Sequence, residues 1–216
     1  MRNILLSTTA ILSIVFSTTG QAEGSGIGIG VHAGTLGYGI DATYGITESI
    51  NIRGQYNTIG LDDDDTDGGL NYNYDLDWNT YGILVDWHPF SGGFRVSAGY
   101  FINNNELTGN ASGTDVEVGN TTYAGTVGLK SAVTFDSSAP YLGVGWGNAA
   151  EHNSQLSFMF EVGALLQGSP KVSLVETSAT PTVSQADLDV EAAQLQSDIE
   201  EFDVYPVVTL GIAYQF

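Results

Sequence analysis

The sequence predicts an all-β protein: a closed antiparallel transmembrane β-barrel of ten strands, with one short amphipathic helix before the last strand. The prediction rests on repeated alternation of apolar and polar residues and on the shortness of every continuous apolar run. If the chain crosses a membrane, it therefore crosses as strands. A barrel of eight strands, with the last short strand fused to its predecessor and one other segment not counted as a strand, is the alternative. Closure is required in both, because a lipid-facing sheet edge would leave backbone N–H and C=O groups unpaired.

The first 22 residues have the pattern of a cleaved secretory signal peptide. Arg2 gives a positive start, the run 4–16 is mostly apolar, and small residues follow in Gly20-Gln21-Ala22. The apolar run is too short to span a bilayer as a helix. We therefore expect residues 1–22 to be removed and residues 23–216 to form one barrel domain.

The composition excludes some functions. Five Lys and Arg stand against 25 Asp and Glu, which gives a net charge of −20 and argues against nucleic acid as a partner. There is no Cys, so an exported chain would be held by backbone pairing without disulfides. The 28 Gly and the singly spaced apolar residues fit strands that face lipid better than a large apolar core.

Ten segments alternate as strands do, with one set of residues on each face. The segment 72–88 changes phase, since Tyr72 to Trp78 share one parity and Tyr81 to Trp87 share the other. This predicts a β-bulge near Asn79-Thr80, or an upper half that stands clear of the bilayer. The segment 123–135, with an aromatic residue at each end, is the clearest candidate for a spanning strand. The ten segments are 26–34, 38–46, 50–57, 72–88, 94–103, 123–135, 141–146, 156–166, 171–176 and 205–216.

The last strand carries the resemblance to a known family. Its apolar residues alternate up to the terminal Tyr214-Gln215-Phe216, and the segment 139–145 is Ala-Pro-Tyr-Leu-Gly-Val-Gly. Together with the glycine-rich strands, these features resemble small bacterial outer-membrane β-barrels of the opacity or OmpA-like superfamily. The resemblance implies outer-membrane lipid and lipopolysaccharide as surroundings. It also implies insertion by the barrel-assembly machinery, with Ile212, Tyr214 and Phe216 as the signal.

Turns and loops set the expected orientation. Tight turns at 47–49, 89–93, 136–140 and 167–170 are assigned to the periplasmic side, where barrels have short turns. The polar segments 61–69, 103–120 and 148–155 are predicted to be outer loops. Between Ser184 and Phe202, apolar residues spaced by three and four predict an amphipathic helix, with Ser184 and Asp187 as its capping pair. We expect this helix to pack on the barrel rim.

Charged residues on the inward parity predict a polar lumen. Three ion pairs are expected there: Asp41 with Arg53, Asp86 with Arg95, and Lys130 with Glu161. His32 and His88 are interpreted as hydrogen-bonded filling, since separated His without Cys make a poor transition-metal site. The pairs either plug the lumen by joining neighbouring strands or line a narrow pore. We favour the plug.

Two weaker patterns point to specific chemistry. Asp63, Asp65 and Asp67 followed by Gly68 match the first half of a calcium loop, but Tyr74 stands where the closing Glu should be. The simpler interpretation is an acidic loop that recruits Ca²⁺ or Mg²⁺ loosely. His152 and Ser154, near Glu151 and Glu161, could form a nucleophile group like that of a lipid A-modifying hydrolase, although a two-residue spacing often arises by chance.

The sequence therefore predicts a monomeric outer-membrane β-barrel without catalytic activity or a dedicated cofactor. Its expected role is structural in the envelope or one of surface contact, as for a surface antigen. A narrow, cation-preferring, porin-like channel is the alternative, because an acidic mouth concentrates cations. A lipid A-modifying hydrolase is the third hypothesis.

Overall fold

The computed structural model describes residues 26–67, 70–150, 155–178 and 183–216; for residues 65–67 and 70 it describes the backbone alone. The predicted signal peptide, residues 1–22, lies outside the described residues. Within them, no helix is long and apolar enough to cross a membrane. The elements in chain order are β1 (Ile27–Gly34), β2 (Gly37–Thr47), β3 (Ile50–Asp67), β4 (Leu70–Trp87), β5 (Phe94–Asn103), β6 (Glu106–Val118), β7 (Thr121–Thr134), β8 (Ser138–Trp146), β9 (Leu156–Leu166), β10 (Lys171–Glu176), α1 (Gln185–Ile199) and β11 (Val204–Gln215).

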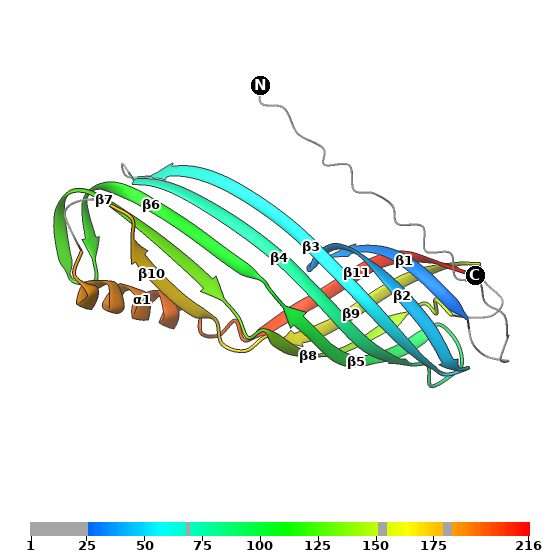
Figure 1. Cartoon of the computed structure of the whole chain (residues 1–216). Helices are drawn as coiled ribbons and strands as arrows, with labels where there is room; N and C mark the ends of the chain where they lie inside the picture. Colours follow the sequence, from blue (N-terminus) through cyan, green and yellow to red (C-terminus); the bar gives the residue numbers. More distant parts are fainter. Residues whose placement is uncertain (1–25, 68–69, 151–154, 179–182) are drawn as a thin grey trace, which may run out of the picture.

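Eight strands close an antiparallel barrel in the order β1-β2-β3-β4-β5-β8-β9-β11. The last strand pairs with the first, from Gly28 opposite Gln215 to Gly34 opposite Thr209, so the sheet has no open edge at this level. Both described ends of the chain lie at one end of the barrel, at the right in Figure 1. We call this end the lower end and the opposite one, at the left, the upper end. The prediction of a closed antiparallel barrel is confirmed.

The remaining strands extend the barrel on the opposite side. The path of β5 continues upward as β6 along the same edge of β4, since β4 pairs with β5 through residues 80–87 and with β6 through residues 71–77. In the same way β7 runs down into β8, and β9 runs up into β10. Together with the upper parts of β3 and β4, the strands β6, β7 and β10 form a curved sheet, here called the extension (Figure 1).

The predicted count of ten barrel strands is therefore wrong, and the alternative of eight is correct for the barrel. The segments 136–140 and 167–170 contain Pro and were interpreted as turns that reverse the chain. In the structure the path is interrupted at residues 135–137, with Pro140 already in β8, and at residues 167–170. Both interruptions lie at the barrel's upper rim, and after each one the path keeps its direction. The segment 148–155 was expected outside, but β8 ends and β9 begins at the lower end, beside the turns at 47–49 and 89–93; residues 151–154 lie outside the described residues.

Two predicted outer loops are largely strand. β3 runs unbroken to Asp67 and pairs residue by residue with β4, so the segment 61–67 is not a loop. The segment 103–120 contains β6, which pairs with β4 and β7. The predicted bulge near Asn79-Thr80 is also absent, because the β3–β4 register is continuous there.

The phase change in β4 agrees with the other predicted alternative to the extent that the upper half of the strand leaves the barrel. Along the barrel, its apolar residues Tyr81, Ile83 and Val85 are exposed on the outer face. Above the rim, the apolar parity moves to the inner face, where Trp78 packs edge-on against the ring of Tyr205. The strand keeps its register while the surroundings of its two faces change.

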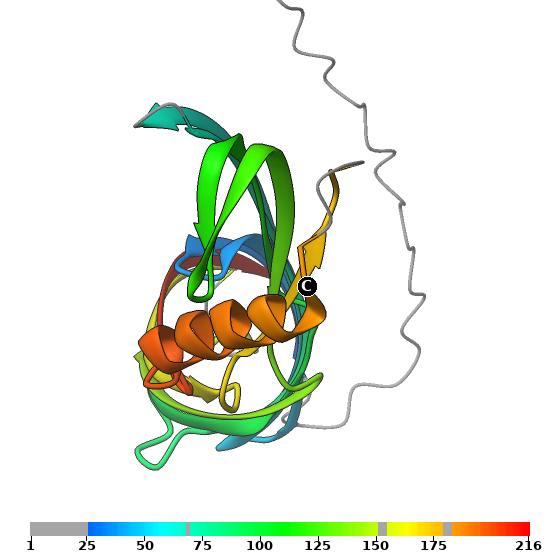
Figure 2. The same cartoon turned by 90° about the vertical axis from the view of Figure 1, so that its left-hand side faces the viewer.

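The helix α1 follows the prediction in its sequence and departs from it in its packing. Ser184 caps it by accepting a hydrogen bond from the N–H of Asp187, as predicted. It ends at Ile199 and packs chiefly on β10 and β6 of the extension rather than on the barrel rim. Leu188 joins a buried cluster with Val118 and Val127. With the barrel seen end-on, α1 passes in front of its upper opening (Figure 2).

Candidate functional site

The barrel interior is the best-defined polar site in the described part of the chain. Because side chains alternate across a strand, every second residue of the barrel strands points inward. Most of those residues are polar and buried, although polar residues are usually found at the surface. They include His32, Asp41, Thr43, Asn51, Arg53, Gln55, Asn57, Thr80, Asp86, Arg95, Ser97 and Glu161.

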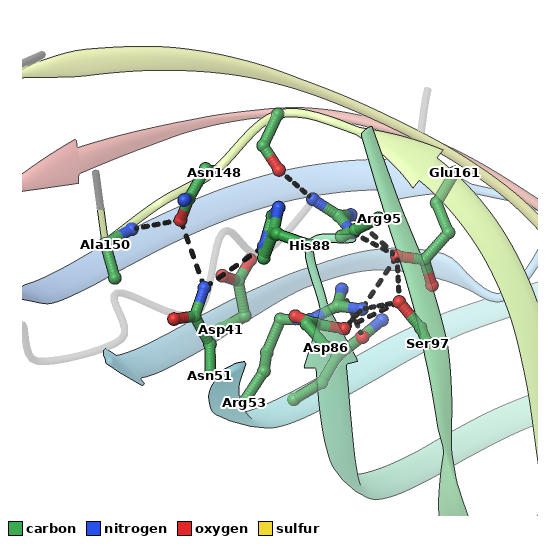
Figure 3. Close-up of polar contacts among 12 residues, drawn as sticks. Asp41, Asn51, Arg53, Asp86, His88, Arg95, Ser97, Asn148, Ala150 and Glu161 are labelled. Atoms are coloured by element: carbon green, nitrogen blue, oxygen red, sulfur yellow. Dashed lines mark hydrogen bonds and ion pairs between the residues drawn. The ribbon is translucent and has the colours of Figure 1, made fainter. Parts of the chain in front are cut away.

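Two arginines and two carboxylates form the centre of this interior (Figure 3). Arg53 on β3 makes a two-pronged contact with Asp86 on β4, with Nε–Oδ2 at 2.8 Å and Nη2–Oδ1 at 3.0 Å. Its Nη2 also donates to Oε2 of Glu161 on β9 at 2.7 Å. Arg95 on β5 donates to the same oxygen from Nη2 at 2.6 Å and from Nε at 3.1 Å. Glu161 thus joins arginines from two strands across the lumen.

Neutral groups complete the network. The hydroxyl of Tyr141 donates to Oε1 of Glu161 at 2.6 Å, and that of Ser97 donates to Oδ1 of Asp86 at 2.6 Å. Arg95 Nη1 donates to the carbonyl of Gly147 at 2.7 Å, which ties the cluster to the lower end of β8. The network therefore satisfies both carboxylates with several donors each, as a buried charge cluster requires.

Two smaller polar groups occupy other parts of the wall. His32 contacts Asp41 through Nδ1 at 3.1 Å and Asn57 through Nε2 at 2.7 Å. Nearer the lower end, Asn51 Nδ2 lies 3.2 Å from Nε2 of His88 and donates to Asn148 Oδ1 at 3.0 Å. Both histidines are buried and hydrogen-bonded, as the sequence interpretation of filling residues expects.

An apolar layer lies inside the barrel above the charges. Leu84, Phe101, Tyr141 and Leu165 belong to one buried cluster, in which the rings of Phe101 and Tyr141 meet edge-to-face at 5.5 Å. Glycines make room for these rings, and one of them lies directly opposite Phe101 on the neighbouring strand. A Cβ on Gly82 would lie 2.5 Å from the Phe101 ring, so this position needs glycine for packing and not for its backbone angles.

The structure changes the partners of the predicted ion pairs. Asp41 lies beside His32 rather than Arg53, and Asp86 is bound by Arg53 rather than by Arg95. The register permits both arrangements, because Arg53 is a diagonal neighbour of Asp86, which lies opposite Asn51, and also of Asp41, which lies opposite Gln55. Alternation identified the inward face and could not identify which side chains meet across the lumen. Ser97 and Tyr141 were missed, since neither carries a sequence signal beyond its parity.

Lys130 does not pair with Glu161. It lies in β7, exposed on the extension, opposite Asn110 of β6 and Val175 of β10. The segment 123–135 was interpreted as a spanning strand, and this is wrong because the segment forms β7 of the extension and not a barrel strand. Its alternating apolar residues pack under α1.

The other predicted residues are placed as follows. Asp63 lies on β3, and the backbone of Asp65 and Asp67 continues that strand, so the calcium-loop geometry does not form. Among the residues that the structure describes, no group of three or more acidic or His side chains could hold a metal ion. Glu151, His152 and Ser154 of the hydrolase hypothesis lie outside the described residues. Ile212, Tyr214 and Phe216 are exposed on the outer face of the barrel beside β1.

Comparison with known proteins supports the fold. No protein-family model matches the chain, and no curated protein matches it. Two solved structures are similar over most of its length. Acinetobacter baumannii CarO shares 24% identity at a TM-score of 0.58, covering 88% of this chain and 98% of that one. A. baumannii CarO2 shares 21% identity at a TM-score of 0.60, covering 90% of this chain and 100% of that one. At these identities the likeness shows a shared fold, and membership of the opacity or OmpA-like superfamily stays a prediction.

Proposed function

We propose that the chain is a non-enzymatic outer-membrane β-barrel with a closed lumen. The observation that supports a membrane location is the outer face of the barrel. Its apolar side chains form a continuous band, and a water-soluble protein rarely exposes so large an apolar surface. Examples of these exposed residues are Ile29, Val31, Ile40, Ile52, Ile83, Val85, Leu142, Val144, Phe158, Leu210 and Ile212.

Aromatic residues border this band at two levels. Tyr44, Trp87, Trp146, Tyr214 and Phe216 are exposed near the lower end, where the described chain ends lie. Tyr38, Tyr81 and Tyr100 are exposed near the upper rim. Aromatic girdles at both interfaces are typical of outer-membrane barrels. The two levels therefore bound the proposed lipid-spanning part, with the extension above it.

The lumen supports a structural role over a channel. An eight-stranded barrel has an interior just wide enough for side chains to fill. Here the Arg53–Glu161–Arg95 bridge crosses it, and the Phe101–Tyr141 layer lies above. The proposed function is therefore support of the envelope, or contact at the cell surface through the extension, by a monomer.

Planar-bilayer recording of the purified full chain tests the closed lumen. We expect no steady unit currents from the wild type, with a general porin in the same bilayer as the positive control. A narrow cation-preferring pore is the competing function, favoured by the net charge of −20. Steady, cation-selective unit currents from the wild type would establish that pore and end the closed-lumen proposal.

Labelling of intact cells tests location and orientation. The chain has no Cys, so a single introduced Cys reports its own position. We expect Lys130→Cys, on the extension, to react with a membrane-impermeant maleimide from outside. Glu48→Cys, in the exposed turn between β2 and β3, should react only after the outer membrane is permeabilised. The reverse pattern, or equal reactivity of both, would contradict the proposed orientation.

A further inference from the structure

The two faces of the extension differ in chemistry. Directly opposed residues of antiparallel strands share a face, so the register sorts them. Tyr72 and Tyr74 continue the lumen side of β4, where their rings lie parallel at 6.1 Å, and this face also carries Leu129 and α1. Asn71 and Asn73 continue the outer side of β4. We call this second surface the polar face.

The polar face contains a pocket of about 460 Å³, within the range of small-ligand sites. Its lining residues belong to β3, β4, β6 and β7 and to the segment just after β10. The side chains that the register and contacts place on this face of the pocket are Asp64, Asn71, Asn73, Asn110, Ser112 and Thr177.

A hydrogen-bonded row prearranges these groups. Asn110 Nδ2 donates to Asn73 Oδ1 at 3.3 Å, and Asn73 Nδ2 donates to Asp64 Oδ1, so the row crosses three neighbouring strands in register. A carboxamide has two N–H donors and an oxygen with two lone pairs. These contacts use one donor and one lone pair of Asn73, which leaves it able to donate and accept toward a ligand.

A glycine, Gly128, leaves space beside the polar groups of the pocket. Gly128 of β7 lies opposite Ser112, and a Cβ there would be 2.7 Å from the Thr177 hydroxyl. The N–H of Thr177 donates to the Gly128 carbonyl at 2.8 Å, which fixes that side of the pocket. A side chain at position 128 would therefore project between the polar groups.

We propose that this pocket binds a neutral saccharide. Each sugar hydroxyl both donates and accepts a hydrogen bond, and a row of amide, hydroxyl and carboxylate groups at strand spacing offers both functions side by side. The described residues that line the pocket include the carboxylate of Asp64 and no Lys or Arg, although Lys130 lies on the same face beside Asn110, so the lining itself offers a phosphate or carboxylate ligand no charged partner. None of the pocket side chains named above is apolar, which argues against an acyl chain.

The position of the pocket suggests two sources of sugar. If the proposed membrane orientation holds, on which this step rests, the polar face continues the lipid-facing surface into the layer above it. The saccharide part of neighbouring lipopolysaccharide lies in that layer. A free oligosaccharide from outside the cell has the same chemistry. The binding site itself depends on the extension alone and can be tested in detergent without assuming any orientation.

Isothermal titration calorimetry of the full chain in a non-sugar detergent tests the proposal. The probes are a neutral hexose oligosaccharide of the lipopolysaccharide outer core, dextran oligomers, chitotetraose and inorganic phosphate. We expect at least one saccharide to bind and phosphate to show no binding. Asn73→Ala and Gly128→Ala should each weaken saccharide binding at least tenfold.

Two matched variants control for general damage. Gly60→Ala adds the same methyl group on β3, where the nearest atom is a carbonyl oxygen at 3.9 Å. Asp77→Asn changes the same face of β4 outside the pocket. Both should bind as the wild type does. Binding of core oligosaccharide identifies a neighbouring lipopolysaccharide as the source, and binding of only the other sugars identifies a free glycan. Binding of no saccharide at millimolar concentration, or equal affinity in all variants, would overturn the proposal, whatever the labelling and current experiments show.

Discussion

Replacing Glu161 by Gln keeps the shape of the side chain and removes its charge. The carboxylate accepts from Arg53 at 2.7 Å, from Arg95 at 2.6 and 3.1 Å, and from the Tyr141 hydroxyl at 2.6 Å. All of these groups lie in the barrel interior, where loss of the Glu161 charge leaves Arg95 without a carboxylate partner, whereas Arg53 keeps Asp86. Removing one member of such a buried cluster costs about 3–5 kcal/mol. We expect the free energy of unfolding to fall by that amount.

Urea unfolding of the barrel in lipid vesicles, followed by tryptophan fluorescence, measures this loss. The matched control is Asp136→Asn, which removes the carboxylate of the exposed Lys171–Asp136 pair at 2.8 Å. Its two side chains are 67% and 53% exposed, so we expect a change of about 0–1 kcal/mol. A loss below about 1 kcal/mol for Glu161→Gln, equal to the control, would refute the claim that the charge cluster stabilises the closed lumen.

Three further changes test other parts of the fold. Gly30→Ala would place a Cβ 2.5 Å from Asp41 Oδ2, and we expect urea unfolding to show about 1–3 kcal/mol of destabilisation; unchanged stability would mean that the carboxylate can move aside. The Tyr123 hydroxyl donates a hydrogen bond to the exposed carboxyl of Asp187, and so does the Ser184 hydroxyl, and these bonds lower the pKa of Asp187 below 3.8. The stability that the ionised Asp187 gives to α1 is therefore present above pH 3.8 and is lost as the pH falls through the lowered pKa. In Tyr123→Phe, hydrogen exchange of α1 should accelerate at a higher pH than in the wild type, and an identical pH profile would contradict the assignment. Leu188→Ala should cost about 2–5 kcal/mol in the protection of α1 while leaving exchange in the barrel strands unchanged, and equal loss in both would show that they unfold together.

The faces of the barrel strands were predictable because each face meets one medium. Along β1 and β2 the apolar residues point outward and the polar or glycine residues inward, as alternation predicts. The inward positions of Arg53, Asp86, Arg95 and Glu161 follow from this parity alone. The helix was predictable for a similar reason, since its apolar spacing and its Ser184 cap are both local signals.

Pairing partners were not predictable, because alternation describes a strand and says nothing of its neighbour. β7 alternates under α1 as it would against lipid, so parity could not separate the extension from the barrel. The interruption at residues 167–170, which contains Pro170, gave the same ambiguity. Pro removes a backbone donor and breaks a ladder whether the chain reverses or continues, as it does between β9 and β10. Each continuation interpreted as a reversal changed the strand count and the side to which later turns were assigned.

The strand count decides what the lumen can do. Arg53 and Glu161 are 108 residues apart, on β3 and β9, and they touch because an eight-stranded interior is narrow enough for two long side chains to span it. A ten-stranded barrel would separate these walls and admit water, which would turn the same residues into the lining of a pore. The interruptions at the upper rim add length to the sheet without adding strands to the ring. The chain thereby builds a tall surface above a narrow, filled barrel, and this geometry favours contact at the extension over passage through the lumen.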